Sequence, residues 1–393
     1  MRDAVIVSAV RTPIGSFQGA LATVSGPKLG AVAIRGAVEQ AGIEPDAIDE
    51  VIMGCVLQGG VGQAPARQAA IFAGLPSSVP CTTINKVCGS GLKTVMMAYD
   101  LVRLGEADVV VAGGMENMTQ APYLLERARD GYRLGHGQLV DLMINDGLWD
   151  VYNDFHMGTA AEMCAREHEI SREDQDSFSI ESYRRALAAI EDGLFVDEIV
   201  PVDVPQRRGD PVRVTQDEEP GRGRPDKIPS LRPVFDKAGT ITAANASSIN
   251  DGAAAVVIMS AEKAAELGCT PLVRIGGYAN HAQAPEWFTT APAKSIQKVL
   301  DRNDLGTGDI DCFEINEAFA VVSLATNREL GLDPERVNTS GGAVALGHPI
   351  GASGTRILVT LIHNLIRQSG RRGIASLCIG GGEAVALLVE REN

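Results

Sequence analysis

The feature that most constrains the fold of this chain is an internal repeat. Three pairs of segments resemble each other at an offset of about 262 to 267 residues, and these are residues 47–54 and 309–316, Ser90-Gly91 and Ser353-Gly354, and residues 109–114 and 375–381. The predicted elements have the same order in both copies: strand, helix, strand, glycine-rich turn, helix, strand and a second glycine turn. Recurrence of several segments in register indicates a structural unit used more than once. We therefore predict two copies of one βαβ-rich unit.

The first copy is predicted to be interrupted by an insertion. The last strand of the second copy, residues 382–389, has its counterpart at residues 252–259, only about 130 residues earlier. Because the other offsets are about twice as large, roughly residues 119–250 lie outside the repeated unit. The expected domains are residues 1–118 together with 251–270, the insertion 119–250, and residues 271–393.

The apolar segments of the repeat are short and continuous, which is typical of strands covered on both faces by helices. We therefore expect an α/β protein with two βαβαβαββ-type repeats, layered α-β-α-β-α around two sheets, and with the insertion as a loop domain. Glycine is frequent, at 43 of 393 residues. Tight turns and close backbone approaches are therefore expected to contribute to the packing.

The insertion is expected to contain one helix, roughly residues 158–192, followed by a basic loop. Residues 205–237 hold eight Lys or Arg against six Asp or Glu, although the whole chain carries a net charge of −15. A local excess of positive charge suits a loop that faces phosphate groups. An ordinary solvated loop fits the same composition, so charge alone does not decide between the two interpretations.

Charge and cysteine spacing argue against several classes of function. A net charge of −15 argues against nucleic acid as the main partner, since phosphate neutralisation needs clustered Lys and Arg. Seven cysteines without a C-x-x-C pair fit neither a disulfide framework nor a zinc site, and no other metal is expected. The N-terminal apolar run is too short for a signal peptide, and no apolar stretch reaches the ~18 residues of a membrane span. We expect a cytoplasmic protein with no membrane partner.

Cys88 is the first candidate for chemistry, within the glycine-containing segment 85–92. Apolar residues recur at helical spacing from Leu92 onward, so a helix is expected to begin just after Cys88. The positive end of a helix dipole favours thiolate over thiol, and the neighbouring glycines would let an acyl group approach closely. A buried cysteine at a tight turn is the alternative interpretation.

His348 precedes the corresponding helix of the second copy, in the segment 347–354. If the two repeats pack about a pseudo-twofold axis, the two helix starts lie near each other. His348 could then take the proton of the Cys88 thiol, which is how a cysteine nucleophile is activated. A core histidine that hydrogen-bonds backbone is the alternative interpretation.

Two further groups follow strands of the second copy. Cys378 precedes three glycines, whose uncovered N–H groups could form an oxyanion hole, and its thiol could itself transfer protons. Asn316 could hold a water or a substrate oxygen at a strand end, where α/β proteins bind ligands. Residues 89–94 lack the third glycine of G-x-G-x-x-G, and no G-x-x-x-x-G-K-[ST] occurs. We therefore predict neither NAD nor ATP.

These segments, in this order, resemble the thiolase family over essentially the whole chain. The likeness depends on four motifs, which are residues 85–91, 316–320, 347–354 and 378–382. The resemblance implies that Cys88 is the acylated nucleophile and His348 its activating base, while Cys378 is the acid/base for the incoming thiol or the acetyl methyl group. It also implies two oxyanion holes, one made by His348 and a water on Asn316. The backbone N–H groups of Cys88 and Gly380 make the other.

The resemblance further implies a ping-pong acyl transfer with CoA as co-substrate and no permanently bound cofactor. Thiolysis of a 3-ketoacyl-CoA leaves an acyl group on Cys88, which CoA removes, and the reverse reaction condenses two acyl-CoA molecules. The insertion would bind CoA, with His156 and Met157 beside the substrate thioester and Ser247 on the pantetheine arm. The other binding residues that the resemblance implies are Ala243, Phe235, Phe319 and Leu148, with Arg222 or Lys227 at the CoA phosphates.

The segment 156–158, His-Met-Gly, resembles the branch of the family that acts on acetoacetyl-CoA. Three alternatives remain open at this point. One is a 3-ketoacyl-CoA thiolase of fatty-acid or aromatic degradation with a longer acyl pocket. A decarboxylating ketosynthase would not be expected to carry Cys378 in a Cys-x-Gly-Gly-Gly segment. A non-catalytic CoA- or lipid-binding member would be expected to lack Cys88, His348 or Cys378.

Two segments leave questions about assembly and electrostatics. Residues 127–141 resemble the segment through which tetrameric thiolases dock, which implies a homotetramer. Glu383 stands where the family often has Gln or Met. Its carboxylate could alter the pKa of Cys378 or His348, or it could face solvent.

Overall fold

In the part of the chain that the structure describes, ten strands form one sheet that runs through the molecule, and the other six form three separate two-stranded sheets, β6 with β7, β8 with β9 and β10 with β11. The computed structural model describes residues 1–392, and ten strands are hydrogen-bonded in the order β4-β3-β5-β12-β1-β13-β16-β15-β14, with β2 beside β12. Their bounds are β1 (Ala4–Arg11), β2 (Gly15–Ser16), β3 (Glu50–Gly54), β4 (Cys81–Ile84), β5 (Val109–Asn117), β12 (Asn250–Ser260), β13 (Val273–Ala282), β14 (Cys312–Ile315), β15 (Arg372–Ile379) and β16 (Glu383–Glu390). Every residue of β1, β5 and β12 is buried, because helices cover both faces of the sheet.

The sheet consists of two halves with the same strand order. In the first half, β3 lies between its parallel neighbours β4 and β5, and β12 pairs antiparallel with both β5 and β1. In the second half, β14 and β15 are parallel, and β16 pairs antiparallel with both β15 and β13. The halves meet where β1 pairs with β13 at Val5 and Ile6. The predicted repeat is confirmed, but the two expected sheets are one, because their first strands pair with each other and so leave no open edge between them.

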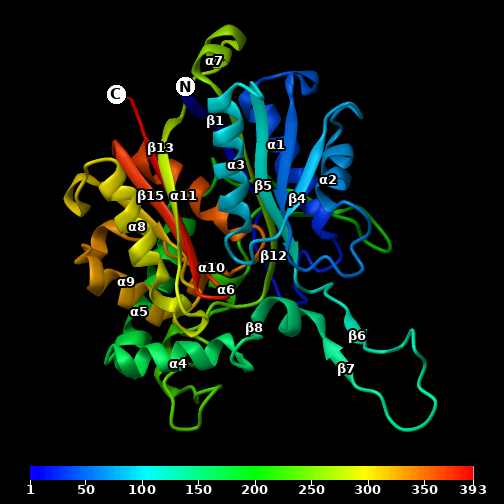
Figure 1. Cartoon of the computed structure of the whole chain (residues 1–393), viewed down its shortest axis with the longest axis vertical. Helices are drawn as coiled ribbons and strands as arrows, with labels where there is room; N and C mark the ends of the chain where they lie inside the picture. Colours follow the sequence, from blue (N-terminus) through cyan, green and yellow to red (C-terminus); the bar gives the residue numbers. More distant parts are fainter. Residues whose placement is uncertain (393) are drawn as a thin grey trace.

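Helices form three layers with the two halves of the sheet between them (Figure 1). α1 and α2 cover the outer face of the first half, and α8 covers the outer face of the second half with α9 beside it. α3 and α11 lie between the halves and share one apolar core with strands of both. This is the predicted α-β-α-β-α layering. The bounds are α1 (Gly26–Ala41), α2 (Pro65–Ala73), α3 (Ser90–Leu104), α7 (Ala261–Leu267), α8 (Ala291–Arg302), α9 (Ala320–Leu330), α10 (Ala343–Leu346) and α11 (Ser353–Arg367), with short 3₁₀ turns η1 (Pro45–Ala47), η4 (Pro285–Thr290), η5 (Thr307–Asp309) and η6 (Pro334–Arg336).

The two central helices touch at their first residues. A Cβ added to Gly91 would lie 2.7 Å from the backbone N of Thr355, and one added to Gly354 would lie 2.2 Å from the backbone N of Leu92. Thr355 Oγ1 also donates to the carbonyl oxygen of Gly91, 2.8 Å away. Glycine is required at both positions because no side chain fits between the helices. This contact brings together the two loops that precede α3 and α11.

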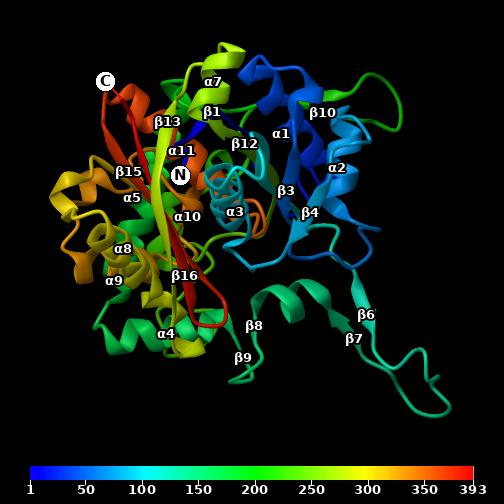
Figure 2. The same ribbon diagram turned by 45° about the horizontal axis from the view of Figure 1, so that its top comes forward.

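The chain between β5 and β12 forms the insertion. The β6–β7 hairpin projects away from the rest of the molecule in both views (Figure 1 and Figure 2), whereas α4 and α5 pack near α9. Within residues 1–392, no helix combines the length and the apolar character needed to cross a membrane. The elements of the insertion are β6 (Tyr123–Leu125), β7 (Leu139–Asp141), η2 (Met143–Leu148), β8 (Trp149–Asp150), β9 (Phe155–His156), α4 (Met157–Glu167), α5 (Arg172–Glu191), β10 (Val202–Val204), β11 (Val212–Val214), α6 (Glu219–Arg222) and η3 (Pro225–Ser230).

The single helix predicted for residues 158–192 is wrong, because two helices occupy this range. α4 ends before the break and α5 begins after it. Glu169, between them, has a φ of 49°, which an α-helix does not accept. Ser171 then caps α5 by accepting the backbone N–H of Asp174 at 3.0 Å, as part of a capping box. The Ser-x-x-Asp pattern was therefore the local signal for a second helix start.

Candidate active site

Cys88 lies in a strained turn between β4 and α3. Val87 has a φ of 46° although it is β-branched, and residues of this kind rarely adopt that conformation. Ser90 holds the turn, because its Oγ accepts the backbone N–H of Lys86 at 2.8 Å and donates to the carbonyl oxygen of Val87 at 2.7 Å. Backbone strain supported in this way is typical of positions where a reactive side chain must be held in place.

Burial controls the acidity of the Cys88 thiol. It raises the pKa of Cys88 to about 11, although the backbone N–H groups of Gly380 and of Cys88 itself hydrogen-bond the sulfur and act in the opposite direction. The raised pKa indicates a protonated thiol at neutral pH in the free protein, rather than the thiolate that the helix start was expected to favour. The same two N–H groups are available to an oxyanion formed on a group bound to this sulfur.

His348 is buried in the loop between α10 and α11. Its backbone N–H donates to Asn250 Oδ1 at 2.9 Å. Its Nδ1 lies 2.5 Å from Ser353 Oγ, and the Ser353 hydroxyl donates to the carbonyl oxygen of Pro349 at 2.9 Å. Because the hydroxyl proton is used in that second bond, Nδ1 carries the ring proton and donates to Ser353. The lone pair of His348 is then on Nε2, which is the nitrogen that can act as a base.

The imidazole of His348 is uncharged at neutral pH. Burial, and to a smaller extent the positive charge of the buried Arg356, lowers the pKa of His348 to about 3. Cys88 and His348 line the same cavity, which therefore contains a neutral thiol and a neutral imidazole. An uncharged imidazole is the form that can accept a proton from a thiol as its sulfur attacks.

Asn316 follows β14 and lies against the ring of His348. Its Nδ2 is 3.5 Å from each of the two ring nitrogens. Its Oδ1 is buried and accepts no hydrogen bond from any residue in the range 1–392. A buried amide oxygen needs a donor, so Asn316 can hold a water or a substrate group beside His348.

Cys378 lies near the end of β15 and is only 1% exposed. Burial, together with the neighbouring Cys88, raises the pKa of the Cys378 thiol well above its usual value. A thiol that keeps its proton at neutral pH can donate it to a carbanion, and the resulting thiolate is a strong base. Gly380 follows two residues later, so the strand end supplies both a proton donor and an N–H group beside Cys88.

One cavity of about 460 Å³ collects most of the predicted residues. Asn316 contacts the ring of His348 but does not line the cavity itself. Among the described residues, no group of His, Cys, Asp and Glu side chains is arranged to hold a metal ion. The predicted residues that line the cavity are Cys88, His348, Cys378, Gly380, His156, Met157, Ser247, Ala243, Phe235, Phe319 and Leu148.

Aromatic rings form part of the cavity wall. The ring of Phe235 stacks on that of His156, with 4.7 Å between centroids, and meets Phe319 edge to face at 6.4 Å. His156 Nδ1 accepts the backbone N–H of Gly158 at 3.0 Å, so Nε2 carries the ring proton. Burial lowers the pKa of His156, which keeps the ring neutral. His156 can therefore donate a hydrogen bond to a carbonyl oxygen without placing a charge in the cavity.

Two family descriptions match the chain almost from end to end. Residues 4–262 match "Thiolase, N-terminal domain", and residues 269–391 match "Thiolase, C-terminal domain". The chain belongs to the thiolase family. The resemblance seen in the four sequence motifs is thereby confirmed.

The chain is similar over nearly its full length to several proteins named acetyl-CoA acetyltransferase. The chain is 56% identical over 393 residues to an acetyl-CoA acetyltransferase of Cupriavidus necator, and both chains are covered completely. It is 53% identical over 393 residues to an acetyl-CoA acetyltransferase of Pseudomonas aeruginosa, again with complete coverage of both. It is also 53% identical to acetyl-CoA acetyltransferase 1 of Arabidopsis thaliana, over 99% of this chain and 94% of that protein. The similarity thus extends over both thiolase domains.

Besides Asn316, two of the predicted residues lie outside the thiolase cavity. Arg222 is exposed at the end of α6, where its Nη1 lies 3.0 Å from Glu218 Oε1. Lys227 is exposed in η3. Their contacts with CoA phosphates stay predictions, and Arg222 would have to leave Glu218 to make one.

Glu383 forms an ion pair with Lys86, in the turn that carries Cys88. The shifts in the pKa of His348 and of Cys378 have burial and other neighbours as their causes, and Glu383 is not among them. Of the two interpretations of Glu383, the structure therefore favours the one in which its carboxylate does not act on either reactive group. The ion pair connects the start of β16 to the turn that carries Cys88.

Sequence reasoning missed several residues of this thiolase site. Ser353 was inside a recognised motif, but its bond to His348 was not foreseen. Asn250 is 98 residues from His348 in the chain, so no local pattern connects the two. The cavity-lining residues that were not predicted are Met118, Gly147, Val234, Ala246, Ser248, Ile249, Phe288, Ala318 and Ile350.

Alkylation tests the protonation state of Cys88. In the free thiolase, we expect the rate at which iodoacetamide labels Cys88 to be still rising with pH at about pH 10, because the reactive thiolate forms only near the raised pKa of about 11. The rate is measured by peptide mass mapping at a series of pH values, with Cys269 followed in the same samples as a reference. A Cys88 rate that levels off below about pH 8 would indicate a thiolate–imidazolium pair and contradict this expectation.

Proposed function

We propose that this thiolase is an acetyl-CoA C-acetyltransferase, which cleaves acetoacetyl-CoA with CoA and, in reverse, condenses two molecules of acetyl-CoA. The observation that carries the proposal is 53% to 56% identity, over the full length, to thiolases named acetyl-CoA acetyltransferase. The cavity supports it, since Cys88, His348 and Cys378 all line it. CoA is a co-substrate in this proposal, and no permanently bound cofactor takes part.

The first half-reaction transfers an acetyl group to Cys88. The sulfur attacks the C3 carbonyl of acetoacetyl-CoA while its proton passes to Nε2 of His348. The N–H groups of Cys88 and Gly380 stabilise the oxyanion. The bond between C2 and C3 then breaks, and the acetyl group stays on the sulfur. His348 and a water on Asn316 stabilise the leaving enolate, and the Cys378 thiol protonates C2 to give acetyl-CoA.

The second half-reaction transfers this acetyl group to CoA. Cys378, now a thiolate, takes the proton of the CoA thiol, and the CoA sulfur attacks the thioester carbonyl of acetyl-Cys88. The bond to the Cys88 sulfur breaks, and this sulfur recovers its proton from His348. Cys88 regains its own proton through His348, and the CoA proton replaces the one that Cys378 gave to C2, so the enzyme is ready for the next cycle.

The insertion is proposed to bind the rest of CoA. His156 and Met157 would lie beside the thioester, and Ser247 would contact the pantetheine arm. Supporting this, Ser247 lines the cavity, and its Oγ donates to the carbonyl oxygen of Ala318 at 3.0 Å. Ala243 and Leu148 would complete the channel. The division into residues 1–118 with 251–270, 119–250 and 271–393 is proposed on the same basis, with the insertion as the CoA-binding unit.

A panel of three substrates tests the proposed reaction. We expect CoA-dependent cleavage of acetoacetyl-CoA to be at least about tenfold faster, in kcat/KM, than cleavage of an eight-carbon or a sixteen-carbon 3-ketoacyl-CoA, because the rings of Phe235 and Phe319 restrict the cavity. The loss of absorbance of each 3-ketoacyl-CoA is followed at equal enzyme concentration. Equal or faster cleavage of the longer substrates would favour the degradative alternative. No cleavage of any of them would contradict the proposed function.

Assembly and cellular context are also proposed from the resemblance. We infer a homotetramer that docks through residues 127–141. In support, Leu134 and Leu139 of this hairpin are 99% and 68% exposed, which is unusual for leucine unless a partner covers it. A cytoplasmic location and a role in fatty acid metabolism are part of the same proposal.

A further inference from the structure

An irregular segment, residues 228–247, forms one wall of the cavity. It contributes Val234, Phe235, Ala243, Ala246 and Ser247 to the lining. Beyond the last residues of η3 it contains neither helix nor strand. Backbone hydrogen bonds to other elements hold its last residues, since the N–H of Ser247 donates to the carbonyl oxygen of Ala318 and the carbonyl oxygen of Asn245 accepts the N–H of Ala320. The rest of the segment depends on side chains of other elements for its position.

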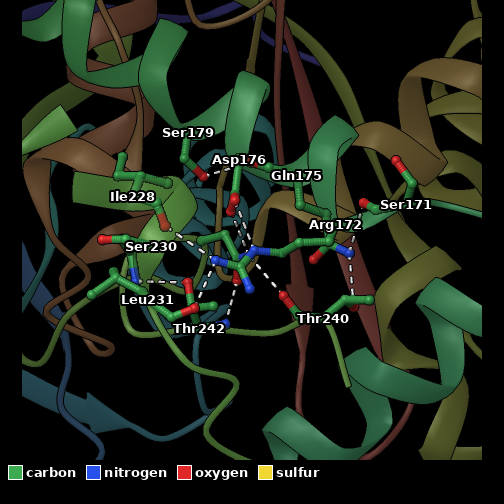
Figure 3. A network of polar contacts seen from close by, with 12 residues as sticks. Ser171, Arg172, Gln175, Asp176, Ser179, Ile228, Ser230, Leu231, Thr240 and Thr242 are labelled. Atoms are coloured by element: carbon green, nitrogen blue, oxygen red, sulfur yellow. Dashed lines mark hydrogen bonds and ion pairs between the residues drawn. The ribbon is translucent and has the colours of Figure 1, made fainter. Parts of the chain in front are cut away.

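Arg172, the first residue of α5, binds the beginning of this segment. Its Nη2 donates to the carbonyl oxygens of Ile228 and Leu231, at 3.1 and 2.9 Å, and its Nε donates to Asp176 Oδ2 at 2.7 Å (Figure 3). A guanidinium can make these bonds together because its N–H groups are fixed in one plane. Arg172 thus connects the end of η3 to the first turn of α5.

Asp176 binds the other end of the segment. Its second oxygen, Oδ1, accepts from Asn245 Nδ2 at 3.3 Å. The same Nδ2 donates to the carbonyl oxygen of Thr240 at 2.9 Å, and Asn245 Oδ1 accepts the backbone N–H of Thr242 at 2.7 Å. Asp176 and Asn245 are both buried, where hydrogen bonds of a charged group are worth most.

The middle of the segment is held by two further side chains. Gln175 Nε2 donates to Thr240 Oγ1 at 2.9 Å (Figure 3). The buried carboxylate of Glu162, on α4, accepts the backbone N–H groups of Thr240 and Ile241 at 2.9 and 2.8 Å. None of these anchoring residues lines the cavity. The anchoring residues contact the segment 228–247, and this segment in turn lines the cavity.

We infer that Arg172 and Asp176 are positioning residues for CoA, which act by holding the segment 228–247 against the cavity. The inference depends on the proposed function, because that function assigns this wall to the CoA arm. Cys88, His348 and Cys378 lie on loops and strands of the repeated core, which these two residues do not anchor. Loss of the anchor therefore weakens CoA binding while the chemical step stays largely intact.

Arg172→Lys and Asp176→Asn test the inference. Lysine keeps the charge beside Asp176, but its single ammonium group lacks the planar set of donors that reaches two carbonyl oxygens and a carboxylate. In both variants we expect the KM for CoA, and the Kd of CoA measured by calorimetry, to rise about tenfold, with kcat within about threefold of the wild type. Acetylation of Cys88 at saturating acetyl-CoA, followed by intact mass, is expected to remain complete.

Arg184→Lys is the matched control, because Arg184 lies on the same helix, is exposed and pairs with Glu181. It should leave KM, Kd and kcat unchanged. A lower melting temperature with unchanged KM and Kd in the Arg172 and Asp176 variants would mean that the residues only support the fold, and would overturn the inference. A fall in kcat with unchanged KM would overturn it as well. If the wild type cleaves no 3-ketoacyl-CoA, the proposed function fails first, which is a distinguishable outcome.

Discussion

Replacing Cys88 with serine is expected to lower kcat for acetoacetyl-CoA cleavage by about 10⁴-fold. A hydroxyl is far less acidic than a thiol, and the ring of His348, whose pKa burial lowers to about 3, is too weak a base to compensate. The intermediate can be observed directly. With acetyl-CoA alone, the wild type should gain one acetyl group on Cys88 and the variant none, as measured by intact mass and peptide mapping.

Cys269→Ser is the control for this experiment, because Cys269 is a free cysteine outside the cavity, with its sulfur 3.5 Å from the carbonyl oxygen of Ala41. It should keep both the acetyl adduct and the wild-type kcat. Two results would contradict the assignment of the nucleophile. One is an adduct that maps to Cys55 or Cys164, and the other is substantial turnover by Cys88→Ser.

The second large effect is expected for Cys378→Ala, which should lower kcat by about 10³-fold. This variant lacks the group that protonates C2 of the leaving acetyl-CoA and that takes the proton of the incoming CoA thiol. Acetylation of Cys88 by acetyl-CoA alone should persist, since CoA can leave as a thiolate without that proton. Steady-state cleavage and the intact mass of the acetylated protein, measured on the same sample, separate the two steps.

Cys164→Ala provides the comparison for packing. Cys164 lies in the same apolar cluster as Cys378 and is also buried, so its replacement removes a thiol of equal volume without removing the proposed proton donor. We expect Cys164→Ala to retain most of the wild-type kcat. If both variants lost activity equally, or if Cys378→Ala turned over like the wild type, the proposed role of the second thiol would be wrong.

The repeat, and the convergence of its candidate reactive residues on one cavity, were predictable because the signal is carried by short segments of the chain. Ser90-Gly91 and Ser353-Gly354 recur since each glycine permits the same close contact between α3 and α11. The reactive side chains stand in the loops before these helices, so the contact that requires the glycines also brings Cys88 and His348 to one cavity. A duplicated pattern thus predicted a spatial pairing across more than 250 residues.

The acidity of the reactive groups was not predictable in the same way. The position of Cys88 before a helix suggested a thiolate, but the raised pKa of about 11 depends on burial by residues from both repeats and from the insertion. The protonated nitrogen of His348 depends on Ser353 and Pro349, through a hydrogen bond that sequence alone does not show. The break between α4 and α5 was missed although its capping signal, the Ser171-x-x-Asp174 pattern, is local.

The sequence by itself determined the family, the duplicated α/β architecture and the candidate reactive side chains, because these depend on residue types at fixed local spacing. Only the tertiary structure decided which of these groups are charged, which His348 nitrogen carries the ring proton, and how Arg172 and Asp176 contact the cavity wall. Each of these depends on the distance between atoms that are far apart in the chain. Hydrogen-bond geometry and loss of hydration set such properties, and neither exists until the chain has folded.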